Sequence, residues 1–193
     1  MRSSWIPALV LLGLVVAFRC LNAAFADTLP NFSPLPALFL CSLIFFRGPK
    51  AWLLPLAAWV LTDPLVSLIQ NEALLGWHHL SLFVGLGLAA GIGVLTRRYP
   101  QAGTVLAASL VSALVFYFAT NTISFITSAI YPKTAAGFLQ AQWTGPVGAV
   151  LPTWVFLRNL AAANLLFTAC FLLARKHWSL AIEQGPEAVV STR

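Results

Sequence analysis

Apolar residues occur in six long runs that fill most of the chain, and polar or turn-forming residues separate them. The runs cover residues 5–21, 35–46, 51–69, 80–95, 104–121 and 154–174. A helix needs about 20 apolar residues to cross the hydrocarbon core of a bilayer, and most runs reach that length with their flanks. The pattern predicts an all-α integral membrane bundle of about six transmembrane helices.

The second run is the weakest of the six. Counted from Leu29 it has about 18 residues, which would rise roughly 27 Å as a helix. Pro30, Pro34 and Pro36 stand at its start, and proline interrupts the hydrogen bonding of a helix interior. This segment is therefore predicted to be a span, a short or kinked helix, or a re-entrant segment.

Composition agrees with a lipid environment. Hydrophobic residues make up 60% of the 193 residues and charged residues only 8%, which is far less charge than a soluble domain carries. The length suits one folded unit. We expect one transmembrane domain over residues 1–176 and a flexible cytoplasmic tail over 177–193, where Gly185 and Pro186 lie.

The formal net charge of +6 reflects topology, because the basic residues lie singly or in pairs at the ends of apolar runs. No basic patch with interleaved aromatic residues suggests a nucleic-acid partner. If all six runs span and the N-terminus is cytoplasmic, the outer side keeps only Arg19, Lys133 and Arg158. The inner side then holds Arg2, Arg47, Lys50, Arg97, Arg98, Arg175, Lys176 and Arg193.

This positive-inside bias predicts a multi-pass membrane protein with a cytoplasmic C-terminus. A re-entrant second run with an external N-terminus would place the charges almost equally well. The first run also has the shape of a signal peptide, with Ala24-Phe25-Ala26 as a cleavage site. Its long apolar core and the interrupting Arg19 favour a retained first span.

Polar groups inside spans are informative because burying them in lipid costs free energy. They gather toward the predicted outer half, whereas the inner halves carry almost none. This distribution predicts an outward-opening binding pocket, and its excess of arginine over aspartate suggests an anionic or strongly polar solute. The candidate substrate-binding residues are Arg19, Asn31, Asp63, Asn121, Tyr131, Lys133, Arg158, Asn159 and Asn164.

Structural roles are the alternative for several of these residues. Asp63 and Arg158 can form a structural ion pair, Arg19 can extend to the outer interface, and Asn121 can cap a helix end. His78 and His79 are adjacent, so on a helix they would not easily share one metal ion. We expect them to be interfacial polar residues, and we expect no bound metal.

Two further patterns bear on binding and assembly. The connection over residues 127–152 is long and is predicted to contain a short interfacial helix near 134–142, so it is either a binding loop or a surface connector. Small residues recur at helical spacing, with Gly13 and Ala17 in the first run and Gly85, Ala89 and Gly93 in the fourth. Such stripes allow close helix packing, either within the bundle or against a partner subunit.

Catalytic motifs are absent from the sequence. It contains no phosphate-binding P-loop, no G-x-S-x-G nucleophile motif and no H-E-x-x-H zinc motif. Nothing in it points to a hydrolase, a protease or a proton pump. We therefore expect a protein that is not an enzyme and that needs no cofactor.

Several short motifs lie between residues 17 and 174. They are Pro30-Asn31-Phe32-Ser33-Pro34 followed by Ala37, Asp63, Thr120-Asn121, Tyr131-Pro132-Lys133-Thr134 with Gly137, and Arg158-Asn159. Together they resemble the pattern of an uncharacterised bacterial membrane family grouped with the substrate-binding S-components of energy-coupling-factor (ECF) transporters, which implies the bacterial plasma (inner) membrane as the location. Asn164 departs from the pattern, in which an acidic residue is expected.

This resemblance implies an ECF S-component-like bundle that captures a vitamin or other micronutrient from outside for ATP-driven uptake. It also implies partners, namely a coupling transmembrane subunit and ATPase subunits. The alternative is a non-transport integral membrane scaffold or assembly subunit. A retained small molecule would favour the S-component, whereas co-purification with a larger complex and no ligand would favour the scaffold.

Overall fold

The computed structural model describes residues 6–25, 27–69 and 77–178. The regular secondary structure of these residues is entirely helical, without strands. Four helices are long and apolar enough to cross a membrane, namely α3, α4, α5 and α7. An all-α fold with helices that could cross a membrane is thus confirmed. The seven helices are α1 (Ile6–Ala24), α2 (Leu35–Phe45), α3 (Pro49–Ile69), α4 (Trp77–Thr96), α5 (Ala102–Thr127), α6 (Ala135–Trp143) and α7 (Trp154–Trp178).

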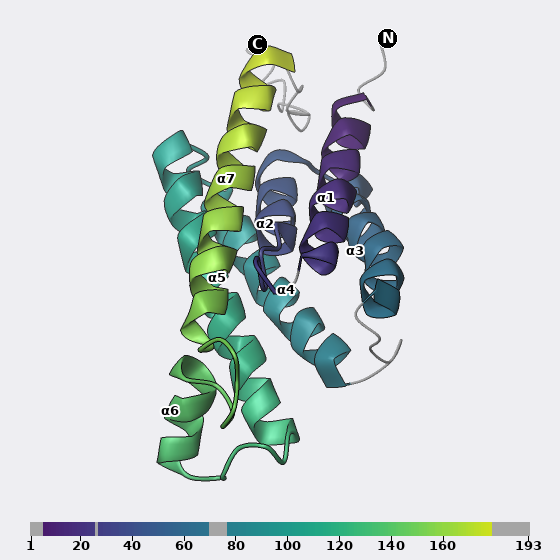
Figure 1. Ribbon diagram of the computed structural model, residues 1–193. Helices are drawn as coiled ribbons and strands as arrows, with labels where there is room; N and C mark the ends of the chain where they lie inside the picture. Colours follow the sequence, from purple (N-terminus) through teal and green to yellow (C-terminus); the bar gives the residue numbers. More distant parts are fainter. Residues whose placement is uncertain (1–5, 26, 70–76, 179–193) are drawn as a thin grey trace, which may run out of the picture.

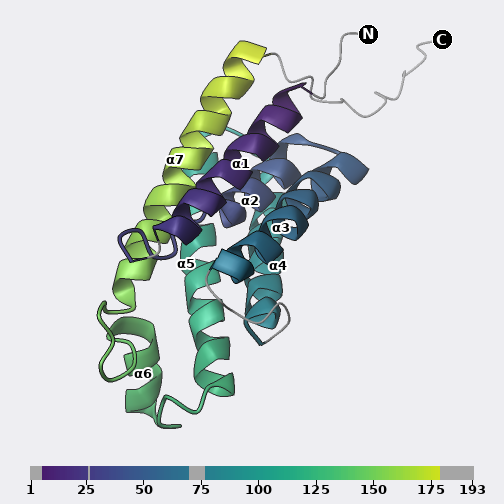
Figure 2. The same cartoon turned by 45° about the vertical axis from the view of Figure 1, so that its right-hand side comes forward.

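The long helices run up and down the bundle, so that the connections gather at two ends (Figure 1). The start of α1, the α2–α3 turn, the α4–α5 turn and the end of α7 lie together at one end in both ribbon views (Figure 2). We call this the basic end, because it carries Arg47, Lys50, Arg97, Arg98 and Arg175. Helix α6 lies at the opposite end, which we call the α6 end.

Helix α2 occupies the centre of the bundle and packs against α3, α4, α5 and α7. All of its eleven residues are buried, as expected for a helix that is apolar all round. Eleven residues rise only about 16 Å, whereas the hydrocarbon core is about 30 Å thick. Of the alternatives for the second apolar run, the structure contains the short helix.

The basic end holds the last turn of α2 in place through two arginines. Arg97 Nη2 donates a hydrogen bond of 2.8 Å to the carbonyl oxygen of Phe46. The guanidinium of Arg175 lies 4.2 Å from the centre of the Phe45 ring. Cations at a helix C-terminus are favourable because the free carbonyl groups there carry partial negative charge.

Helix α4 uses its stripe of small residues inside the bundle. A Cβ atom on Gly85 would lie 2.6 Å from the ring of Phe116 on α5, and one on Gly93 would lie 2.8 Å from the Leu40 carbonyl oxygen on α2. Ala89 between them is fully buried. The suggestion that this stripe docks a partner subunit is therefore wrong, because α2 and α5 already cover it.

The α5–α6 connection differs from the expectation in one respect and agrees in another. Helix α5 continues six residues beyond Asn121 to Thr127, so Asn121 is not a helix cap. The short helix expected near 134–142 is confirmed as α6, whose first turn is capped by a 3.1 Å hydrogen bond from Gly137 N to Thr134 Oγ1.

The predicted boundary at 176 between membrane domain and tail falls inside a helix. Helix α7 continues to Trp178, so the first two residues of the predicted tail are helical. The rest of that tail lies outside the described residues.

Candidate functional site: a buried polar cluster between three helices

Asp63 is the centre of a polar cluster that joins α1, α3 and α4. Its carboxylate is mostly buried, with the residue only 8% exposed. One oxygen accepts a 3.2 Å hydrogen bond from Arg19 Nη2 on α1. The other lies 2.8 Å from His79 Nε2 in the first turn of α4. We call Arg19, Asp63 and His79 the Arg–Asp–His cluster.

Chain direction places this cluster in the half of the bundle nearer the α6 end. Helices α1 and α3 start at the basic end, and Arg19 and Asp63 lie in their second halves. Helix α4 starts at the α6 end with Trp77, so His79 lies in its first turn. The three side chains thus meet at one depth although they are far apart in sequence.

Arg19 does not extend to an interface, as one alternative suggested, because it is only 7% exposed and bonds Asp63. An isolated buried charge is costly, and a paired one is tolerated when hydrogen bonds satisfy its remaining polar atoms. Asp63 meets that condition with a partner on each oxygen. Arg19 does not meet it fully.

Three polar atoms in and beside the cluster are buried without a hydrogen-bond partner in the structure: Arg19 Nη1, His78 Nε2 and Trp59 Nε1. The His78 ring lies against that of His79, with centroids 3.9 Å apart. Trp59 is one helical turn before Asp63 on α3 and packs on Phe83 of α4 at 6.4 Å. Buried polar groups normally have partners. Of the six buried side-chain atoms without one among the described residues, three belong to Arg19 and to residues beside the cluster.

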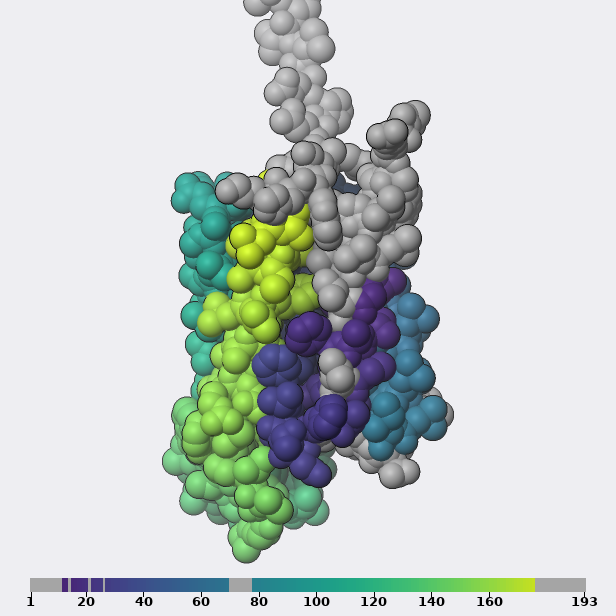
Figure 3. All heavy atoms as spheres, turned by 45° about the horizontal axis from the view of Figure 1, so that its top comes forward, coloured from purple at the N-terminus to yellow at the C-terminus, as the bar shows by residue number. Residues whose placement is uncertain are grey.

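A second polar region lies next to the first and holds the chain between α1 and α2. Residues 27–34 form an irregular segment between α1 and α7, which is exposed at 27–29, half-buried at 30–33 and buried at Pro34 (Figure 3). Asn22 of α1 accepts a 3.0 Å hydrogen bond from Phe32 N, and the rings of Phe18 and Phe32 stack at 6.2 Å. Helix α1 is thereby tied to this segment three residues beyond Arg19.

Helix α7 binds the other side of the segment through two buried asparagines. Asn159 Nδ2 donates to the Pro30 carbonyl oxygen at 3.0 Å, and Asn164 Nδ2 lies 3.4 Å from the Ser33 carbonyl oxygen. Asn31 has the left-handed backbone conformation, with φ of 59°, which asparagine tolerates better than most residues. These three predicted site residues hold the segment in place.

Arg158 lies outside the Arg–Asp–His cluster. Its side chain is exposed, its Nε donates to Asn159 Oδ1 at 3.2 Å, and its guanidinium lies 5.7 Å from the Trp154 ring centre. An ion pair between Asp63 and Arg158 was one expectation, and it is wrong because Arg19 and His79 occupy both carboxylate oxygens.

The remaining predicted residues, Asn121, Tyr131 and Lys133, belong to the α5–α6 hairpin. Lys133 Nζ donates to the carbonyl oxygens of Phe125 and Ser128, the latter at 2.6 Å, and closes the C-terminus of α5. Tyr131 is half-buried in the connection, and this burial raises the pKa of its phenol. Asn121 is half-buried on α5. The structure thus divides the predicted pocket into three separate regions.

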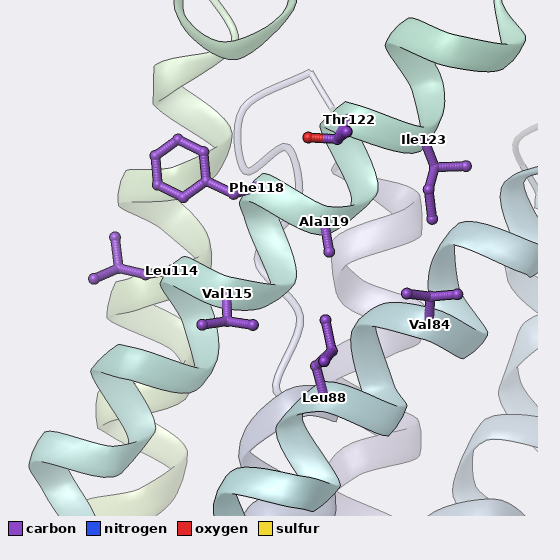
Figure 4. Close-up of a pocket in the computed structure, with 8 residues that line it drawn as sticks. All are labelled: Val84, Leu88, Leu114, Val115, Phe118, Ala119, Thr122 and Ile123. Carbon is purple, nitrogen blue, oxygen red and sulfur yellow. The ribbon is translucent and has the colours of Figure 1, made fainter.

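A shallow apolar groove lies elsewhere, between α4 and α5 (Figure 4). Thr122 is the only polar residue that lines it. Its walls are therefore compatible with lipid chains and offer little to a polar solute. The other lining residues are Val84, Leu88, Leu114, Val115, Phe118, Ala119 and Ile123.

The candidate site residues drawn from the sequence omitted His79 and Trp59, and His79 was interpreted only as an interfacial polar residue. The only available signal was that His79 and Asp63 both lie within about two turns of the same connection between consecutive helices. Among the described residues, no three His, Cys, Asp or Glu side chains converge as a metal site requires. The cluster itself consists of one arginine, one histidine and one carboxylate.

Comparison with known proteins yields one match. No curated protein and no solved structure matches the chain significantly. A family model described as "Family of unknown function (DUF6580)" matches residues 1–182, which is nearly the whole chain of 193 residues. The chain therefore belongs to the DUF6580 family.

Proposed function

We propose that this protein is the solute-binding subunit of an ECF-type uptake system in the bacterial plasma membrane. In this proposal all six apolar segments form the membrane domain, with α1 as a full span and α2 together with residues 27–34 as the second crossing. The short sequence motifs that resemble S-components support the assignment. The solute is a vitamin or other micronutrient captured from outside.

The observation that carries the proposal is the incompletely paired Arg–Asp–His cluster. A purely structural ion pair would be expected to satisfy its own polar atoms, because an unpaired buried donor costs about 1–3 kcal/mol. Here Arg19 Nη1 and the neighbouring His78 Nε2 and Trp59 Nε1 are left without partners. Such atoms are suited to binding a polar solute that supplies the missing hydrogen bonds.

The distribution of basic residues supports binding of the solute from outside. The basic end carries Arg47, Lys50, Arg97, Arg98 and Arg175, and the positive-inside tendency assigns such an end to the cytoplasm. The cluster lies in the opposite half of the bundle, which is then the external half. A solute would reach it from outside without crossing the apolar core around α2.

Uptake against a gradient needs an energy source, and the sequence has no nucleotide-binding motif. The proposal therefore includes a coupling membrane subunit with ATPases. Gly13 and Ala17 of α1 are exposed, and nothing lies within 4 Å of a Cβ built on Gly13. This face allows close approach of another helix and is the proposed contact, since the stripe on α4 is already covered.

Native mass spectrometry of the gently purified protein tests solute capture. A retained small molecule that disappears in an Asp63→Asn variant would support the proposal. Wild-type protein that never carries a small molecule, and that is recovered only within a larger complex, would instead favour the scaffold role.

Co-purification tests the partner. Ala17→Leu should abolish recovery of ATPase subunits. It should leave the retained solute unchanged, because Ala17 is exposed, whereas the solute-binding Arg19 is buried against Asp63 on α3. Ala107→Leu, at an exposed position on α5, is the matched control and should change neither. Concentrative uptake by the chain alone, in vesicles without any ATPase, would overturn the ECF assignment.

A further inference from the structure

We infer that the Arg–Asp–His cluster binds a carboxylate or similar oxyanion group of the solute, with Arg19 Nη1, Trp59 Nε1 and His78 Nε2 as donors at the N-terminus of α4. This inference rests on the proposed function and specifies the chemical class of the solute. Three observations support it: the unpaired atoms are hydrogen-bond donors, the charge around them is not negative, and both oxygens of Asp63 already have nitrogen partners.

The unpaired atoms require an acceptor. A guanidinium has only donors, an indole N–H is only a donor, and a neutral imidazole can carry its proton on Nε2. Arg19 Nη1 and Trp59 Nε1 can therefore be satisfied only by a group with lone pairs. An oxyanion supplies several lone pairs at once, and hydrogen bonds to a charged acceptor are the strongest kind.

The local charge also favours an anion. Arg19 contributes one positive charge and Asp63 one negative charge, so the pair is close to neutral. The N-terminus of α4 adds partial positive charge from the backbone N–H groups of its first turn, in which both histidines lie. A helix N-terminus alone would not make a site, but Arg19 is a nearly fully buried cation whose own Nη1 has no hydrogen-bond partner.

A cationic solute group fits less well. Among the described residues, Asp63 is the only carboxylate in the cluster. Both of its oxygens already have a nitrogen partner, Arg19 Nη2 at 3.2 Å and His79 Nε2 at 2.8 Å. A bound cation would have to displace one of them. It would also lie beside Arg19, so that two positive charges would share a poorly solvated site.

Acetate is a suitable probe, because it is a small carboxylate, and acetamide is its neutral counterpart of nearly the same shape. A ligand that binds only the folded state raises the melting temperature. We expect acetate to raise the melting temperature of the full-length protein in nanodiscs by roughly 5–10 °C, once the acetate concentration exceeds its Kd about a hundredfold. Acetamide should have no effect when sodium chloride keeps ionic strength equal.

Two conservative substitutions remove single donors without removing the scaffold. Arg19→Lys keeps a positive charge beside Asp63 but lacks the second terminal nitrogen. Trp59→Phe keeps a ring against Phe83 but lacks the N–H. Each should abolish the acetate shift or reduce it at least twofold. The matched controls are Arg158→Lys and Trp154→Phe, an exposed arginine and its aromatic neighbour, which should keep the full shift.

Several outcomes would overturn the inference. These are equal shifts by acetate and acetamide, no shift with either, or an acetate shift that survives both donor substitutions. The proposed function fails differently, when native mass spectrometry finds no retained solute. A retained neutral or cationic solute, together with no response to acetate, would refute the oxyanion inference and leave the solute-binding function standing.

Discussion

Gly93 of α4 crosses α2 so closely at Leu40 that a Cβ atom at position 93 would come within 2.8 Å of the Leu40 carbonyl oxygen and 3.1 Å of its Cα. The contact is with backbone, so no side-chain rotation can relieve it. Because α2 packs against four other helices, movement of α2 would disturb the whole core. Glycine at this position therefore sets the distance between two central helices.

We predict that Gly93→Ala destabilises the bundle by about 1–3 kcal/mol, the usual cost of overpacking a core. Gly91→Ala is the matched control, since Gly91 is exposed on the same helix and has nothing within 4 Å of its added Cβ. It should change stability by no more than about 0.5 kcal/mol. Equilibrium unfolding in mixed micelles measures both values, and equal values would contradict the close crossing.

Asp63→Asn should destabilise the protein by about 3–5 kcal/mol, because it leaves the buried charge of Arg19 without a counterion. Adding Arg19→Met should recover most of that loss, since the unpaired charge is then gone. The same unfolding assay gives the coupling energy of the pair. Asp27→Asn, at an exposed position, serves as the control, and additive effects at 19 and 63 would contradict the ion pair.

Asn159→Ala should loosen the segment over residues 27–34, because the Pro30 carbonyl oxygen loses its 3.0 Å donor. A buried polar group left unpaired costs about 1–3 kcal/mol. The rate of backbone hydrogen exchange in residues 27–34, measured by mass spectrometry, should rise in the variant. Arg158→Ala tests whether the effect passes through the neighbouring guanidinium, and it should leave the exchange unchanged.

The proposed orientation can be tested with single cysteines in a variant that lacks Cys20, Cys41 and Cys170. Arg98 and Lys133 are both exposed and lie toward the basic end and the α6 end, respectively. A membrane-impermeant maleimide applied to intact cells should label Lys133→Cys and not Arg98→Cys. The opposite labelling pattern would reverse the orientation and place the Arg–Asp–His cluster in the cytoplasmic half.

Local sequence was sufficient for the helices themselves. Long apolar runs must be helical in lipid, because only a helix satisfies its own backbone hydrogen bonds there. The three prolines before Ala37 similarly predicted a weakened second span, and α2 is indeed short. The α6 helix was foreseen from the residues that follow Thr134, which caps it.

Only the tertiary structure decided which polar residues meet. In a soluble helix the polar face reveals its orientation, but in a membrane bundle the lipid side and the core side are both apolar. The sequence therefore does not determine how α1, α3, α4 or α7 is rotated about its own axis. Asp63 consequently pairs with Arg19 and His79 instead of Arg158, the other arginine predicted at its depth.

The same ambiguity explains the small residues of α4. Gly85 packs against α5 and Gly93 against α2, whereas Gly87 and Gly91 are exposed. All four are glycines on one helix, so residue type does not distinguish them. Composition and periodicity determined that α4 could pack closely. Its rotation in the bundle decided which glycines do so, because the contact depends on the position of α2, a buried helix whose apolar surface is the same on every side.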